Sequence, residues 1–408
     1  MSTTAVMAEI PAFNPLDPAF IADPYPTYHR LRETAPVWLS PLGKWIVTRY
    51  DDVALVLRDR RFGRDFAVNM HRHYGPTILD EPAFASMERM MLVMEPPDHT
   101  RLRGLVTKAF TARRMEAMRP RIAAVVETLI DRVAGKGRMD VITDFAHRLP
   151  IIVICDMLGI PEEDRERFFI NSRANARMFD PVKLSREEID TANANTEETN
   201  TYFDELFAQR RREPRDDLTT ELVHAEEAGD RLSAAELRAN VALLFVAGHE
   251  TTANLIGNGL LALHRNPAQW AALKAEPRII PGAMEELLRY DSSVQMTGRT
   301  VKEDLELAGV ALPKGSQIVC LLGAANRDPA AFAEPDRLDV RREKVTPLSF
   351  GGGIHFCLGA QLARIEAQEA FAGLLRRLPD MILPERDNPT WRPSFTLRGL
   401  ANLPARWN

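Results

Sequence analysis

The segment FGGGIHFCLG, at Phe350–Gly359, places Cys357 between glycines. Glycines on either side let the backbone approach a flat ligand closely and turn tightly into a following helix. A cysteine at a helix N-terminus is favoured as a thiolate, because free N–H groups and the helix dipole stabilise negative charge there. A thiolate held in this way is a suitable axial ligand for haem iron. The alternative, a glycine-rich turn with a structural cysteine, accounts less well for this spacing.

A second polar motif, AGHETT, interrupts a long apolar segment at Ala247–Thr252. An acid and two hydroxyls are costly in such surroundings unless they are partnered. The hydroxyl of Thr251 can bond the carbonyl of Ala247, four residues back, and Gly248 removes a side chain beside it. Together these residues can open the helix locally into a groove for dioxygen and a water. A helix kink at a packing contact is the alternative interpretation.

The two motifs together resemble those of the cytochrome P-450 superfamily of haem-thiolate monooxygenases. Phe350, Gly353, Cys357 and Gly359 meet its pattern F-x-x-G-x-x-x-C-x-G, and the resemblance runs from about Pro24 to the C-terminus. It implies the cytochrome P-450 fold, with the haem between a long central helix and the helix of the cysteine loop. The chain is similar to the soluble bacterial type, since no membrane-anchoring helix is seen at its N-terminus.

The resemblance also implies which residues serve the cofactor and the reaction. Cys357 would ligate the iron of haem b, and Glu250 with Thr251 would deliver protons to iron-bound oxygen. Further cofactor-binding positions are Phe350, Gly353, Gly359 and Ala247.

The implied reaction uses dioxygen and two externally supplied electrons to hydroxylate, or otherwise oxidise, a hydrophobic small molecule. A peroxide-driven peroxygenase or a haem-thiolate isomerase is an alternative, but such enzymes do not need the acid–alcohol pair of Glu250 and Thr251. An alternative from another class is a haem-dependent gas sensor or ligand carrier. A sensor would normally carry an output domain or a DNA-binding helix, and neither is visible in the sequence.

A buried haem needs cations for its two propionates. His99 and Arg103 stand one helical turn apart in HTRLR, so they share a helix face. By resemblance, Arg299 and His355 complete the propionate clamp. Charge-assisted bonds to carboxylates are strong, and arginine suits them. A solvated helix face is the alternative for His99 or Arg103 taken alone.

The motif ELLR places Glu286 and Arg289 on one helix face. As a surface pair they would contribute only about 0.3–0.5 kcal/mol. In the family this pair is buried, holds the segment before the cysteine loop, and is completed by a further arginine. Arg337 is the candidate for that arginine, with Arg341 as the alternative.

The substrate side is expected to be apolar, which indicates a hydrophobic small molecule. Methionines in the loop before HTRLR suggest tolerance of irregular shapes, although plain core packing accounts equally well for each single Met or Phe. The pocket residues implied by resemblance are Phe84, Met87, Met90, Leu243, Val246, Ala247, Val294, Thr297, Phe395 and Thr396.

Electrons must come from another protein, because the sequence has no flavin or nicotinamide fingerprint and no spare cysteines for an iron–sulfur cluster. A small acidic ferredoxin with its reductase is the expected donor. Lys108, Arg113 and Arg114 form a basic cluster that could receive it, or they are an ordinary solvated helix face.

The elements that must position these residues are mostly helices. Ser233 and Glu236 form a capping-box start for a largely apolar helix of about 30 residues that ends at Asn266-Pro267. A second helix is expected from Pro277 to Tyr290, and a third from Cys357 to about Leu378. Short strands are expected at 36–39, 44–48 and within 300–322, and no clear period appears at 60–98. The fold class is therefore mainly α with a smaller β-rich region.

Length and composition agree with this organisation. The 408 residues have 45% hydrophobic and 27% charged residues and a net charge of −5, too balanced for a nucleic-acid or membrane surface. No apolar run is long enough to span a membrane. Three cysteines cannot make a disulfide framework, which favours the cytoplasm. We expect a flexible tail at 1–15, a single haem-binding domain at 16–408, and a monomer.

Overall fold

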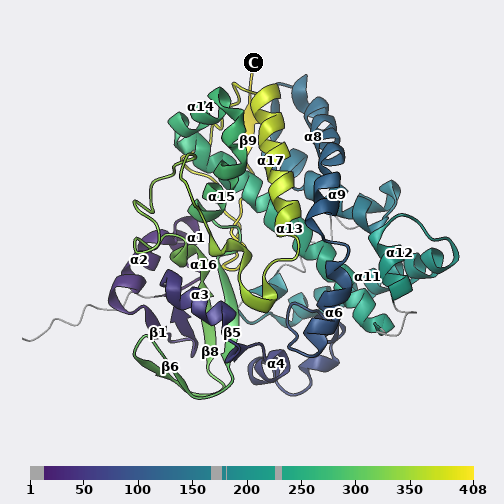
Figure 1. Cartoon of the computed structure of the whole chain (residues 1–408), viewed down its shortest axis with the longest axis vertical. Coiled ribbons are helices and arrows are strands. Elements are labelled where there is room, and N and C mark those ends of the chain that lie inside the picture. Colours follow the sequence, from purple (N-terminus) through teal and green to yellow (C-terminus); the bar gives the residue numbers. More distant parts are fainter. Residues whose placement is uncertain (1–12, 167–176, 181, 226–231) are drawn as a thin grey trace, which may run out of the picture.

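Most of the described chain is helical; the labelled strands β1, β5, β6 and β8 lie at the lower left, whereas β9 lies near the top beside α17 (Figure 1). The computed structural model describes residues 13–166, 177–180, 182–225 and 232–408. The expected class, mainly α with a smaller β-rich region, is confirmed. No helix in these described ranges has the length and apolar character needed to cross a bilayer.

The α-helices are α1 (Pro18–Ala22), α2 (Tyr25–Thr34), α3 (Tyr50–Arg58), α4 (Phe66–Tyr74), α5 (Pro82–Glu88), α6 (Asp98–Thr107), α7 (Ala112–Ala117), α8 (Arg119–Ala134), α9 (Arg148–Leu158), α11 (Arg186–Arg212), α12 (Leu218–Ala225), α13 (Ala234–Arg265), α14 (Pro267–Ala275), α15 (Ile280–Tyr290), α16 (Leu322–Ala325) and α17 (Ala360–Arg377). Short 3-10 turns are η1 (Ile78–Asp80), η3 (Glu162–Asp164), η4 (Arg177–Phe179), η5 (Pro277–Ile279), η6 (Leu348–Phe350) and η7 (Gly353–His355), and η2 (Val141–Ala146) is a π-helix. The strands are β1 (Val37–Leu39), β2 (Trp45–Val47), β3 (Phe62–Gly63), β4 (Arg138–Asp140), β5 (Met296–Val301), β6 (Leu305–Leu307), β7 (Val310–Leu312), β8 (Gln317–Leu321) and β9 (Pro404–Arg406).

The central helix α13 begins where its caps predict. The side chain of Ser233 accepts the N–H of Glu236, and the carboxylate of Glu236 accepts the N–H of Ser233. The helix runs for 32 residues and stops at Asn266, before the proline that opens α14. It is buried on most sides, as its apolar sequence requires.

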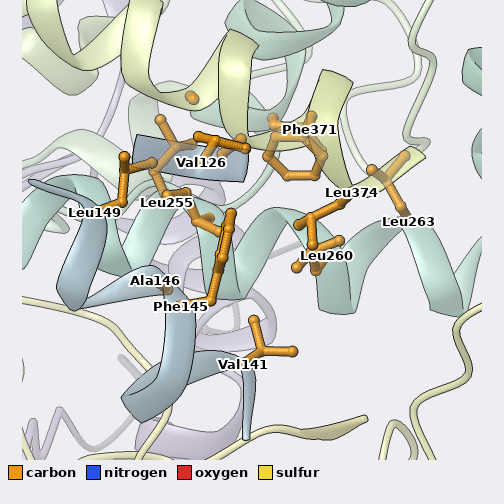
Figure 2. Close-up of a cluster of buried hydrophobic side chains, with 14 of the residues drawn as sticks. Val126, Val141, Phe145, Ala146, Leu149, Leu255, Leu260, Leu263, Phe371 and Leu374 are labelled. Carbon is orange, nitrogen blue, oxygen red and sulfur yellow. The ribbon is translucent and has the colours of Figure 1, made fainter. Parts of the chain in front are cut away.

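The largest core cluster packs around α13 and fixes its place (Figure 2). Leu255, Leu260 and Leu263 of α13 are each at most 2% exposed. Phe145 from η2 and Phe371 from α17 lie against the same core and are fully buried. Because interiors are packed as densely as organic crystals, α13 and α17 are held at a fixed separation.

The main sheet has the strand order β1-β2-β8-β5-β3. Strand β5 is antiparallel to both its neighbours, and its Thr300 lies opposite Gly63 of β3. The same register places Arg64, directly after β3, beside Arg299 of β5. Two arginines distant in the sequence therefore meet at one edge of the sheet.

The structure differs from the sequence predictions in the N-terminal tail and in the segment 60–98. Residues 1–12 of the predicted tail lie outside the described residues, but Phe13 is buried and stacks edge-on against Phe20 and Phe395. The segment 60–98, which shows no clear period, forms the short helices α4 and α5. Neither helix exceeds 9 residues, so each is too short to display a periodic pattern.

Candidate functional site

The cysteine loop is a tight, hydrogen-bonded turn. The N–H of Cys357 donates to the carbonyl of Phe350 at 2.9 Å, and the N–H of Phe356 donates to Gly353 at 3.1 Å. Gly353 has φ +64°, and a Cβ there would lie 2.3 Å from the carbonyl oxygen of Leu57. Only glycine fits that position without displacing the backbone of α3.

Cys357 lies just before α17 rather than inside it. The helix begins at Ala360, with Gly359 as its N-cap, so the predicted start at Cys357 is wrong by three residues. Burial raises the pKa of the Cys357 thiol, whereas the N–H of Gly359 and the cations Arg103 and Arg364 oppose this shift. One N–H donor and two cations thus already favour a thiolate, and a metal cation would complete its stabilisation.

The AGHETT segment lies in the middle of α13 and has the predicted back-bond. The hydroxyl of Thr251 donates to the carbonyl of Ala247 at 2.9 Å, and that of Thr252 donates to Gly248 at 3.4 Å. Thr251 keeps partial exposure, whereas Thr252 is buried. The two hydroxyls therefore satisfy backbone carbonyls within a helix that remains continuous.

Glu250 is fully buried and paired with a residue that the sequence did not indicate. Arg392 donates to it, with 2.5 Å between Nη1 and Oε2. Burial alone would raise the pKa of Glu250, but the charge and hydrogen bonds of Arg392 outweigh it and hold that pKa below its ordinary value. Arg392 lies 142 positions further along the chain, in WRPSF, where no motif marks it.

A second buried acid, Glu366 of α17, was also missed. It is 1% exposed, and burial raises its pKa to about 8 despite a hydrogen bond with Thr252. At neutral pH it is mostly protonated. The available signal was a glutamate inside a largely apolar predicted helix, which is costly unless neutral or partnered.

The four residues expected at the propionates come together between α6, β5 and the cysteine loop. The rings of His99 and His355 have centroids 4.5 Å apart. Arg103 donates to the carbonyl of Phe356 at 2.6 Å. The pKa of His355 is lowered to about 4, mainly by burial. The nearby charge of Arg299, which is 6% exposed, also lowers that pKa.

This cluster fits the carboxylates of a haem. The Nε2 atom of His355 is buried, and Glu95 lies 3.7 Å away, beyond hydrogen-bond distance. Arg64, which the sequence did not indicate, adds a further cation whose Nε is buried without an acceptor among the described residues. Buried donors of this kind call for an anion.

Glu286 and Arg289 form a buried, bidentate pair. Their Nε–Oε2 and Nη2–Oε1 distances are 2.7 and 2.8 Å, and both side chains are fully buried. The arginine that completes the pair is Arg342, whose Nε lies 3.1 Å from Glu286. The predictions of Arg337 and of Arg341 are therefore wrong.

The side chains of those two arginines point elsewhere. Arg337 pairs with Glu334 at the surface, and Arg341 pairs with Glu276. Arg337 contributes only its carbonyl, which accepts from Arg289. The segment has no regular secondary structure, so sequence spacing could not show which arginine turns inward.

An apolar cavity lies between α5, α11 and α13. It contains three of the predicted pocket residues, Met87, Met90 and Val246. The complete lining is Ala83, Ser86, Met87, Met90, Met178, Phe179, Thr196, Thr199, Asn200, Phe203, Ala242, Phe245 and Val246.

The other predicted pocket residues lie outside this cavity. Phe84 and Leu243 are buried in core clusters, and Phe395 packs against the N-terminal aromatics. Val294 makes an isolated bridge to Leu397. Two predicted residues make polar contacts instead: the hydroxyl of Thr297 accepts from Arg64 and Arg299, and that of Thr396 donates to a carbonyl.

Two apolar side chains of the cysteine loop are exposed, and so are two residues of the predicted basic cluster. Ile354 and Phe356 are 47% and 42% exposed. Lys108 and Arg113 of the predicted basic cluster are exposed, whereas Arg114 is paired with Glu221 at 2.6 Å.

Three comparisons with known proteins agree with this geometry. A family model described as Cytochrome P-450 matches residues 29–404. The chain is 43% identical over 414 residues to Cytochrome P-450 107B1 of Saccharopolyspora erythraea, with 98% of each chain covered.

Two solved structures are similar throughout. One is P-450BioI in complex with a hexadec-9Z-enoic acid ligated acyl carrier protein, with 39% identity, TM-score 0.89, and 95% of this chain and 99% of that chain covered. The other is the myxobacterial CYP267B1 in complex with myristic acid, with 41% identity, TM-score 0.89, and 96% and 98% covered.

Proposed function

The chain belongs to the cytochrome P-450 family of monooxygenases, and from this premise we propose that it carries haem b and oxidises a long-chain acyl compound. The observation that carries the proposal is the loop that presents Cys357 before α17, with Gly359 and Arg103 favouring a thiolate. When bound, haem supplies one-electron and dioxygen chemistry that side chains cannot.

The residues around the loop would bind the cofactor. Cys357 would ligate the iron, and Phe350, Gly353 and Gly359 would shape the loop beneath the ring. His99, Arg103, Arg299 and His355 would meet the propionates. On the other side, Ala247 of α13 would lie against the ring.

Thr251 and Glu250 would move protons. The Thr251 hydroxyl is bonded to Ala247 and can rotate to donate toward a ligand beside α13. Glu250 is held charged by Arg392, which is 17% exposed and so reaches toward solvent. A carboxylate that releases this arginine can take a proton from solvent and pass it inward. This intact pair favours monooxygenation over a peroxygenase or an isomerase.

The cavity supports an apolar chain as substrate. Met87, Met90, Phe203, Phe245 and Val246 form its apolar walls, and methionines adapt to irregular shapes. Two relatives are described with acyl ligands, one of them carried by an acyl carrier protein. We therefore favour fatty acyl chains among hydrophobic substrates.

A ferredoxin with its reductase would supply the electrons. Ile354 and Phe356 expose apolar surface on the cysteine loop, and Lys108 and Arg113 expose positive charge. Lys108→Glu/Arg113→Glu should slow reduction by an acidic ferredoxin at low salt, and less so at high salt, because screening removes electrostatic steering. Stopped-flow reduction checks this, with the exposed Lys136→Glu as the control. Equal rates in both variants would contradict it.

Two spectra test the proposal as a whole. The reduced, CO-bound protein should show the red-shifted Soret band of thiolate ligation, and Cys357→His should abolish that shift. A histidine-type spectrum in the unaltered protein would refute the assignment. Myristic and hexadec-9-enoic acids should produce a substrate-induced spin-state shift, whereas a response only to rigid polycyclic compounds would overturn the acyl part. A cytoplasmic location, a single domain and a monomeric state stay predictions.

A further inference from the structure

Arg64 stands in an unusual electrostatic position beside the expected propionate site. It follows β3 directly, and the antiparallel register with β5 brings it beside Arg299. Both guanidinium groups donate to a single hydroxyl, that of Thr297, at 3.2 Å from Arg64 Nη2 and 3.3 Å from Arg299 Nη1. Two cations therefore share one neutral acceptor.

Glu95, the acid near Arg64 and Arg299, already has hydrogen-bond partners for both carboxylate oxygens. Glu95 accepts the backbone N–H of Arg64 at 2.9 Å, and its other oxygen contacts Lys302. Within the described parts of the chain, the buried Nε of Arg64 has no acceptor. Burial, followed by repulsion from Arg299, lowers the pKa of Arg64 to about 9. An arginine keeps its charge in proteins, so such a site calls for an added anion.

The surroundings of Arg64 identify that anion. Besides Arg299, its charge acts on His99 and His355, so Arg64 faces three of the four residues expected at the haem carboxylates. We propose that Arg64 is a fifth residue of this site, and that its guanidinium shares one haem propionate with Arg299. This inference rests on the proposed haem, and it adds a positioning residue that the family resemblance did not supply.

Two physical consequences follow. A charge-assisted hydrogen bond to a buried carboxylate stabilises the bound haem, so its removal should speed haem loss about tenfold. Removing a positive charge near the iron also disfavours the more negative, reduced state. The reduction potential of the substrate-free protein should therefore become more negative in a neutral variant and stay close to its original value in a lysine variant.

The experiment compares Arg64→Gln and Arg64→Lys with Arg61→Gln. Arg61 is a matched surface arginine three positions before Arg64, and it is paired with Asp59. Haem transfer to apomyoglobin and the reduction potential are measured on each loaded protein. Faster haem loss in both Arg64 variants, with a lower potential only in Arg64→Gln, supports the proposal. If Arg64→Gln fails to fold, the propionate bending band in the resonance Raman spectrum of Arg64→Lys decides: a shifted band supports it, and an unshifted band overturns it.

Two other outcomes are informative. Unchanged haem loss and potential in Arg64→Gln, together with weaker binding of myristic acid but not of its methyl ester, would overturn the proposal in favour of a site for the substrate carboxylate. The CO-bound spectrum should keep its thiolate form in every Arg64 variant, because Cys357 is untouched. Failure of the thiolate assignment would appear in the unaltered protein, so the two failures are distinguishable.

Discussion

Replacing Arg392 with methionine would leave the Glu250 carboxylate buried without its cation. Removing one partner of a buried ion pair costs roughly 3–5 kcal/mol. Arg392 is 17% exposed, so solvent screens part of its charge and we expect a loss near the lower limit, about 3 kcal/mol at neutral pH. Methionine retains much of the apolar stem, so little of this loss would come from packing.

The loss should depend on pH. In the unaltered protein the pKa of Glu250 lies below its ordinary value of 4.5. The ion pair with Arg392 therefore stabilises the fold fully above pH 4.5. This stabilisation is lost as the pH falls through the pKa that Glu250 has in the folded state. Without Arg392, burial dominates and raises the pKa of Glu250. The variant therefore loses stability as pH rises through that raised pKa. The stability difference should be small near pH 4 and largest at neutral pH.

Urea unfolding followed by circular dichroism between pH 4 and pH 8 measures this difference. Glu250→Gln/Arg392→Met is the matched control, because a neutral amide needs no counter-charge and replacing a whole buried pair is often close to neutral. It should recover most of the stability at pH 7. A loss in Arg392→Met that is the same at every pH, or a double variant no more stable than the single one, would refute the reasoning.

Three further changes test other parts of the site. Thr251→Ala should retain haem and substrate binding but divert electrons to peroxide, measured as peroxide released per NADPH consumed; full coupling to product would contradict its proton role. Arg342→Met should cost about 1.5–3 kcal/mol of stability, the range for a hydrogen bond to a charged group, because Glu286 keeps Arg289. Arg337→Met and Arg341→Met should stay within about 0.5 kcal/mol, and the reverse order would contradict the assignment of the third arginine. Gly353→Ala should reduce haem retention, because alanine is strained at φ +64° and meets backbone there; normal retention would show that the loop can shift.

Features set by neighbouring residues could be predicted from the sequence. The capping box of Ser233 and Glu236 involves positions three apart, and it located the start of α13 to the residue. The bond from Thr251 to Ala247 follows from helix geometry alone. The Glu286–Arg289 pair was likewise predicted, because residues three apart share a helix face.

Contacts between distant segments could not be predicted in this way. Arg392 reaches Glu250 across 142 positions, and Arg64 reaches Thr297 across 233. Neither arginine belongs to a motif, and their roles depend on how the C-terminal segment and β3 pack. The prediction of the arginine that completes the Glu286–Arg289 pair failed for a related reason. In a segment without regular secondary structure, the residue spacing does not show which side chain points inward.

Two buried glutamates, one on α13 and one on α17, show why residue type alone does not determine the charge of a side chain. Glu250 and Glu366 are both almost completely buried, and the burial of each raises its pKa. Arg392 reverses the shift for Glu250, so that carboxyl is charged and can exchange a proton only by releasing its cation. Glu366 is hydrogen-bonded to the neutral hydroxyl of Thr252, and the effect of this bond on its pKa is smaller than that of burial. The pKa of Glu366 therefore rises to about 8. At neutral pH one of these two buried glutamates is therefore negatively charged and the other is mostly neutral, and only the charged one is linked by its partner to the protein surface.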